Sequence, residues 1–156
     1  MANALSMTLL GLLAAMLLAA CWWDVKSRTI PNELNLAIAL LAIPFWWSIG
    51  LPLWPGVAIQ VGIAAIVFGL FTVAFAIGAM GGGDVKLIGA LALWLPFQAL
   101  VLLLVVMSLA GGVLTAAMYL RHRIKAREGR LEVPYGLAIA FGGLWLISER
   151  FLNQFG

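Results

Sequence analysis

Residues 81–86 read GGGDVK and stand between two long apolar runs, where a carboxylate is unexpected. An ionisable side chain in such a place is expensive to bury, so it usually faces water or a partner and marks a functional site. The three glycines before Asp84 allow positive φ values and a close approach of the backbone. A second isolated carboxylate, Asp24, lies at the end of the first apolar run. We therefore expect Asp24 and Asp84 to meet at one membrane face and to act as a pair.

The composition excludes an ordinary soluble domain, because 65% of the 156 residues are hydrophobic and only 10% are charged. Long charge-free runs of this kind are typical of transmembrane helices. The longest polar segment, residues 121–132, is too short to form a core of its own. We expect residues 1–156 to form one helical membrane domain with no separate soluble domain. The net charge of +3 then reports membrane topology and not nucleic-acid binding.

The apolar runs predict an all-α membrane protein with six transmembrane helices, at residues 4–23, 34–49, 56–79, 85–95, 97–120 and 134–151. The charge-free stretch 87–120 would be about 50 Å long as one helix, which is too long for a bilayer. A hairpin broken near Pro96 is therefore predicted. It places the basic loops together on the cytoplasmic side and both chain termini outside.

The predicted fourth helix, residues 85–95, is only about 17 Å long, roughly half the thickness of the hydrocarbon layer. A helix this short leaves non-helical backbone within the hydrocarbon layer. Such backbone is tolerated there only where protein covers it or where water fills a cavity. We therefore expect Asp84 at the floor of a water-accessible pocket that faces the cytoplasm.

Two neighbouring carboxyl groups share one proton and titrate as a coupled pair. The ionised member can take a proton from water while the protonated member polarises a carbonyl group. This chemistry needs no metal, and the only histidine, His122, lies among arginines with no cysteine cluster nearby. We therefore expect no metal and no other cofactor.

Other roles for the carboxylates are open at this point. Each could cap a helix end, which for Asp84 is compatible with catalysis. Both could relay protons or cations in a small transporter whose short helix lines the translocation site. Both could also be dispensable, if the protein is a non-enzymatic scaffold of a secretion machine.

Two short motifs resemble the signatures of type IV prepilin peptidases. Residues 24–32, DVKSRTIPN, resemble the first signature, an Asp six residues before Ile-Pro-Asn. Residues 81–87, GGGDVKL, resemble the second, a Gly-x-Gly-Asp-x-Lys box shared in part with presenilin-type intramembrane aspartic proteases. With both motifs in this order, the resemblance covers essentially the whole chain.

The resemblance implies an aspartic endopeptidase of the bacterial inner membrane. Such enzymes remove the positively charged leader from prepilins or pseudopilins at the cytoplasmic face, next to the substrate's hydrophobic helix. Asp24 and Asp84 are then the catalytic pair. We expect supporting or substrate-binding roles for Pro31, Asn32, Gly81, Gly83, Lys86, Pro134, Tyr135 and Gly136. Lys86 could neutralise Asp84, hold a substrate carbonyl or extend to the membrane surface.

The sequence departs from the larger, bifunctional members of that family. Those carry a cytoplasmic domain near the amino terminus, often with paired cysteines, and also methylate the new N-terminus. Here Cys21 is the only cysteine, and residues 133–140, VPYGLAIA, resemble the short peptidases of Flp (tight-adherence) pilus systems. We expect a peptidase without N-methyltransferase activity, embedded in the lipid bilayer and without a nucleic-acid partner. The sequence specifies no oligomeric state.

Overall fold

The computed structural model describes residues 4–125 and 135–155, which form helices and no strand. The helices are α1 (Ala4–Ser27), α2 (Asn32–Ser48), α3 (Ala58–Ala76), α4 (Gly82–Ala92), α5 (Phe97–Lys125) and α6 (Tyr135–Phe155), with a π-helical turn η1 (Leu53–Val57) before α3. The all-α prediction is confirmed, as is the chain break near Pro96. Pro134 and the loop 126–134 lie outside the described residues.

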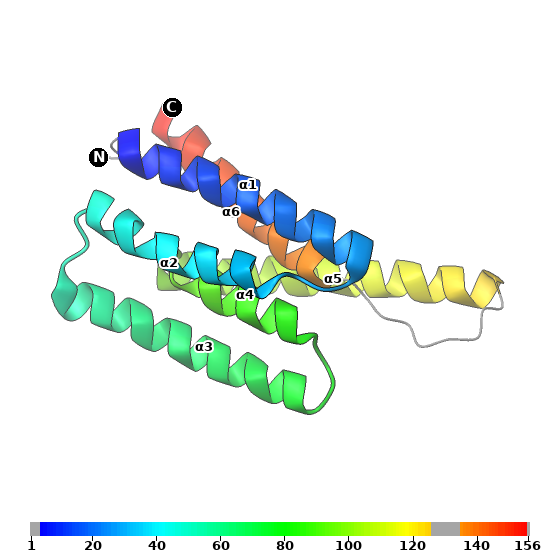
Figure 1. The fold of residues 1–156 in the computed structure, drawn as a ribbon. Coiled ribbons are helices and arrows are strands. Elements are labelled where there is room, and N and C mark those ends of the chain that lie inside the picture. The colour runs from blue at the N-terminus through cyan, green and yellow to red at the C-terminus, as the bar shows by residue number, and fades with distance from the viewer. Residues whose placement is uncertain (1–3, 126–134, 156) are drawn as a thin grey trace.

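The short helix α4 occupies the middle of the bundle, where it contacts α2, α3 and α6. Figure 1 shows α1 beside α6 along one side and α3 along the opposite side. The start of α1 and the end of α6 lie at the same end of the bundle, and α5 extends past the other helices at the opposite end (Figure 1). Each residue of α4 from Leu87 to Ala92 is buried, so protein and not lipid surrounds this helix.

Three of the described helical segments are long and apolar enough to cross a membrane: Ala4–Ser27, Leu53–Ala76 and Phe97–Leu120. The helices α2, with 17 residues, and α4, with 11 residues, are shorter. The chain is therefore a multi-pass membrane protein by length and composition, and three of the six predicted spans meet both criteria.

The first helix is longer than the sequence predicted, since α1 continues past Trp23 to Ser27. Asp24 consequently lies in the last turn of α1, whereas the predicted helix ended one residue before it, and that predicted boundary is wrong. The Asp24 carboxylate accepts a hydrogen bond from the Leu137 N–H, so this polar side chain is satisfied without ending the helix. Lys26 in the same turn is favoured by the helix dipole.

The glycine cluster serves close packing and not positive φ angles. Gly81 is the N-cap of α4 with extended backbone (φ −74°), and the positive φ of 74° occurs earlier, at Gly78. A Cβ on Gly83 would lie 3.2 Å from the backbone nitrogen of Ile30. The expectation of positive φ at residues 81–83 is therefore wrong. Small residues are needed there because α4 begins directly against the turn between α1 and α2.

The C-terminal end of α4 lies inside the bundle, where its free carbonyl groups need donors. Side chains of two neighbouring helices supply them. Gln60 Nε2 donates to Ala92 O and to Leu95 O, both at 2.6 Å, and Trp46 Nε1 donates to Leu93 O at 2.7 Å. These bonds explain how so short a helix ends within an apolar bundle.

Gln60→Leu is expected to lower the free energy of unfolding by about 2–3 kcal/mol, because it leaves two carbonyl groups near the end of α4 without donors. Leucine has a similar volume, so packing changes little. The measurement is thermal unfolding in detergent, followed by circular dichroism. Thr72→Val is the control: its hydroxyl only bonds Phe68 O within the exposed face of α3, so the expected change is below about 0.5 kcal/mol. Equal effects of the two variants would contradict this role of Gln60.

Candidate active site

The two carboxylates of the sequence motifs meet where α1, α4 and α6 converge. Asp24 lies in the last turn of α1 and Asp84 in the first turn of α4, with exposed fractions of 4% and 7%. Asp24 Oδ2 accepts a hydrogen bond of 3.1 Å from the Leu137 N–H. The N–H of Gly136 lies within hydrogen-bonding reach of both carboxyl groups. The first turn of α6 therefore holds the pair together.

Gly136 has no space for a side chain. A Cβ at this position would lie 2.7 Å from Asp24 Oδ2 and 2.9 Å from Ile30 Cδ1, both closer than real contacts allow. The missing side chain lets the backbone of α6 reach the carboxylates directly. Free N–H groups at a helix N-terminus favour negative charge. Gly136, which was expected in a supporting or substrate-binding role, thus lies directly beside the Asp24 carboxylate.

Asp84 folds back over the start of its own helix and interacts with the N–H of Gly81, the N-cap residue. In a capping box, the side chain of the third helical residue accepts a hydrogen bond from the N-cap N–H in this way. Asp84 can therefore cap α4 and also serve as a candidate catalytic residue. Asp84 lies outside the three membrane-spanning segments. Burial, and secondly the charge of Asp24, raise the pKa of Asp84 to about 7. At neutral pH Asp84 therefore keeps its proton on a large fraction of molecules.

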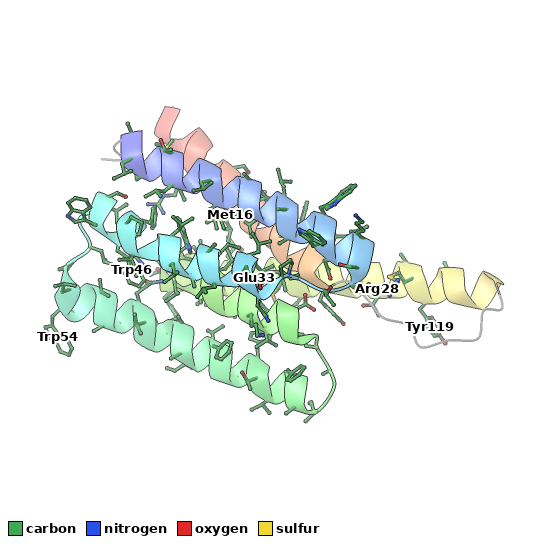
Figure 2. The ribbon with its side chains drawn as sticks, viewed as in Figure 1. Met16, Arg28, Glu33, Trp46, Trp54 and Tyr119 are labelled. Atoms are coloured by element: carbon green, nitrogen blue, oxygen red, sulfur yellow. The ribbon has the colours of Figure 1, made fainter. Side chains whose placement is uncertain are left out.

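A cavity of about 300 Å³ adjoins Asp84. It is lined by the turn between α1 and α2, at positions 28–30 and 32, and by Gly81, Gly82 and Gly83. Figure 2 shows Arg28 at the end of α1 and Glu33 at the start of α2, both at this end of the bundle. The cavity is large enough for several waters or a short stretch of peptide.

Arg28 is a site residue that the sequence assigned only to membrane topology. Its φ of 54° is in the left-handed region, which is unfavourable for a side chain other than glycine. Arg28 lines the cavity and interacts electrostatically with Asp24, one helical turn earlier. The spacing of four residues between opposite charges was the available signal in the sequence.

The other predicted supporting residues differ in how they contact the two aspartates and the cavity. Pro31 is the N-cap of α2, and Asn32 begins that helix and lines the cavity. The Lys86 ammonium donates to Asn32 Oδ1 at 2.7 Å, which ties α4 to α2. The ring of Tyr135 lies against Gly111 of α5, where a Cβ would be 3.0 Å away. Gly81, Gly83, Asn32 and Gly136 therefore surround the pair, whereas Tyr135 packs toward α5.

Asn35 is a further residue that sequence reasoning missed. It is 4% exposed, and its Nδ2 donates to the carbonyl of Gly83 at 3.3 Å, beside Asp84. It shares a buried stripe of α2 with Ile38, Ala42 and Phe45. The sequence did contain an indication of Asn35, since it is the single amide on an otherwise apolar face of α2.

The sequence profile of the type IV leader peptidase family matches residues 11–116, which include both aspartates. The chain belongs to the type IV leader peptidase family. Helix α6, with Gly136 and Leu137, lies outside the matched residues.

The chain resembles curated members of the type IV leader peptidase family that are named prepilin leader peptidase/N-methyltransferase. It is 31% identical over 134 residues to the protein from Stutzerimonas stutzeri, a match that covers 81% of this chain and 44% of that protein. It is 27% identical over 141 residues to the proteins of two strains of Burkholderia pseudomallei, covering 84% of this chain and 43% of each. The chain therefore matches less than half the length of these relatives. No solved structure gives a significant match.

Proposed function

We propose that this protein is an aspartic endopeptidase that removes the leader peptide from type IV prepilins of the Flp kind. The observation that carries the proposal is the pair of buried carboxyl groups, Asp24 and Asp84, which interact with each other and both approach the Gly136 N–H. Such a pair is suited to amide hydrolysis by water without a metal. Family membership and the names of the relatives support prepilins as the substrate class.

The surroundings of the two carboxyl groups suggest different roles for them. The Asp24 carboxylate accepts a hydrogen bond from the Leu137 N–H and interacts electrostatically with Arg28, contacts that suit a proton acceptor. In the proposed mechanism Asp24 takes a proton from water as the water oxygen bonds to the scissile carbonyl carbon. Asp84 donates its proton to the carbonyl oxygen. When the C–N bond breaks, the departing amine receives the proton from Asp24, and one hydroxyl of the tetrahedral intermediate returns a proton to Asp84, so both carboxyl groups regain their starting states.

We place the site at the cytoplasmic face of the bacterial inner membrane. Lys26, Arg28 and Lys86 lie close to the two aspartates in sequence, and an excess of basic residues is typical of cytoplasmic loops. The prepilin leader is expected on the same side, with the substrate's hydrophobic helix in the bilayer. The proposal assigns leader removal to this chain and not N-methylation.

The test is co-expression of the protein with a candidate Flp-type prepilin in a host that lacks prepilin peptidases. We expect a faster-migrating pilin on gels and, by mass spectrometry, a new N-terminus without an added methyl group. A pilin that keeps its leader across a panel of such prepilins would overturn the proposal. Proton or cation flux into vesicles containing the purified protein would then favour the transporter instead.

The rate of leader removal is expected to fall as the pH rises through about 7, because Asp84 then loses the proton that the mechanism requires. Burial of Asp84 and, secondly, the charge of Asp24 set this behaviour, and Arg28 interacts electrostatically with Asp24. The measurement is kcat/KM between pH 5.5 and pH 9 with purified enzyme in lipid vesicles. A rate that continues to increase up to pH 9 would contradict a protonated Asp84 in the active form.

A further inference from the structure

A groove of about 530 Å³ opens between α2, α3 and α4. Each helix lines it with four residues at spacing i, i+3, i+4 and i+7, within positions 32–39, 61–68 and 86–93. Such a stripe is one face of a helix about 10 Å long, or two turns. The groove thus has the length of two turns of a helix lying along it.

The groove begins at the active site. Asn32 lines both this groove and the cavity beside Asp84, and the Lys86 ammonium bonded to Asn32 stands at the same end. Farther along, the lining is apolar and ends near Val61 and Leu93. A chain that passes Asp84 can therefore continue from a polar entrance into an apolar channel.

Asn35, which lines this groove, carries an unpaired acceptor. Its Nδ2 is used by the Gly83 carbonyl, but its buried Oδ1 has no hydrogen-bond partner within residues 4–125 and 135–155. A buried acceptor of this kind costs about 1–3 kcal/mol unless a donor reaches it. Asn35 also lines the groove, so a bound chain can supply that donor.

We propose that the groove receives the first two turns of the substrate's hydrophobic helix, directly after the scissile bond, and that Asn35 Oδ1 accepts an N–H at the start of that helix. This inference rests on the proposed function. A peptide bond under attack must be extended, so the helix begins beyond it. The first N–H groups of a helix have no acceptor within the helix, and its apolar side chains match the lining.

Filling the groove tests the proposal. Ala65 of α3 lines it and is exposed, so Ala65→Phe occupies the groove without overpacking the core. Ala117→Phe is the matched control, because Ala117 is also exposed and lines a different groove, between α5 and α6. We expect Ala65→Phe to lower kcat/KM about tenfold or more and Ala117→Phe to change it less than about twofold.

The outcomes separate this inference from the proposed function. Normal cleavage by Ala65→Phe, with an active wild-type enzyme, overturns only the groove assignment and leaves the groove to lipid. A loss confined to Ala117→Phe moves the substrate helix to the groove between α5 and α6 and also overturns it. Failure of the wild-type enzyme to cleave any prepilin overturns both.

Cysteine cross-linking gives a second readout that does not depend on rate. The single native cysteine is removed by Cys21→Ser, and Ala65→Cys or Ala117→Cys is added in an Asp24→Asn background that retains uncleaved substrate. A prepilin with one cysteine in the first two turns of its hydrophobic helix is the probe. A disulfide through position 65 and not 117 is expected, and the reverse pattern overturns the proposal.

The role of Asn35 is tested by a KM-against-kcat comparison. A protonated aspartic acid retains both the donor and the acceptor, whereas leucine removes both. Asn35→Leu is expected to raise KM several-fold more than Asn35→Asp does. A fall in kcat alone, with KM unchanged, would mean that Asn35 only positions the Gly83 turn, and the contact with substrate would be rejected.

Discussion

Asp24→Asn and Asp84→Asn are each expected to lower the rate of leader removal by roughly 10³-fold or more, because an amide can neither accept the proton from water nor donate one to the substrate carbonyl. The double variant is expected to be no less active than either single variant, since the two groups act as a unit. The measurement is the gel shift of the pilin, together with single-turnover kinetics in vesicles. Cleavage within tenfold of the wild-type rate in either variant would reject the aspartate pair.

The loss of activity is not expected to come from unfolding. Because the pKa of Asp84 is raised to about 7, ionisation of this buried group opposes folding, and the stability of the wild-type protein falls as the pH rises from about 4 toward 7. Asp84→Asn removes that dependence. At pH 8 the inactive variant should therefore unfold in detergent at the same temperature as the wild type or a higher one.

Gly136→Ala is expected to lower kcat about 100-fold, because its Cβ would lie 2.7 Å from Asp24 Oδ2 and must displace that carboxylate. The added methyl group also meets Ile30 Cδ1, so Asp24 cannot simply move toward the turn between α1 and α2. Kinetics with the purified variant measure the effect. Its pH–rate profile should also shift, because a displaced Asp24 carboxylate changes the charge that helps to raise the pKa of Asp84.

Gly11→Ala is the matched control for this variant. Gly11 lies on α1, and a Cβ there would have no neighbour within 4 Å, so activity should be unchanged. If Gly136→Ala retained wild-type kcat and pH profile, the direct support of the pair by α6 would be rejected. If it lowered only the unfolding temperature, Gly136 would be a packing residue.

The order of the elements could be predicted because each depends on local sequence. The apolar runs gave the helices, and Pro96 marked the break that separates α4 from α5. Charge spacing and the two motifs also placed Asp24 and Asp84 in one site. The N–H of Gly136 interacts with both carboxyl groups, and their action as a catalytic pair stays a prediction.

What the sequence could not show depends on contacts between distant segments. α1 continues through Asp24 because the start of α6, more than a hundred residues later, supplies the donor for its carboxylate. The donor residues Gly136 and Leu137 have no distinctive side chain, so no motif of polar residues pointed to them. The same holds for Gln60, whose role appears only once α3 lies beside the end of α4.

The side chains of Trp46 and Gln60 at the far end of α4 also bear on how a hydrolase can operate in an energised membrane. A protease needs water at its acidic groups. A continuous file of water through the bundle would, however, let protons leak across the membrane. Gln60 and Trp46 use their donors on the carbonyl groups of Ala92, Leu93 and Leu95, and Trp94 bonds Ile38 O at 2.9 Å. The end of α4 thus takes its donors from protein side chains and not from water, so the proposed site needs no path for water through the whole bundle.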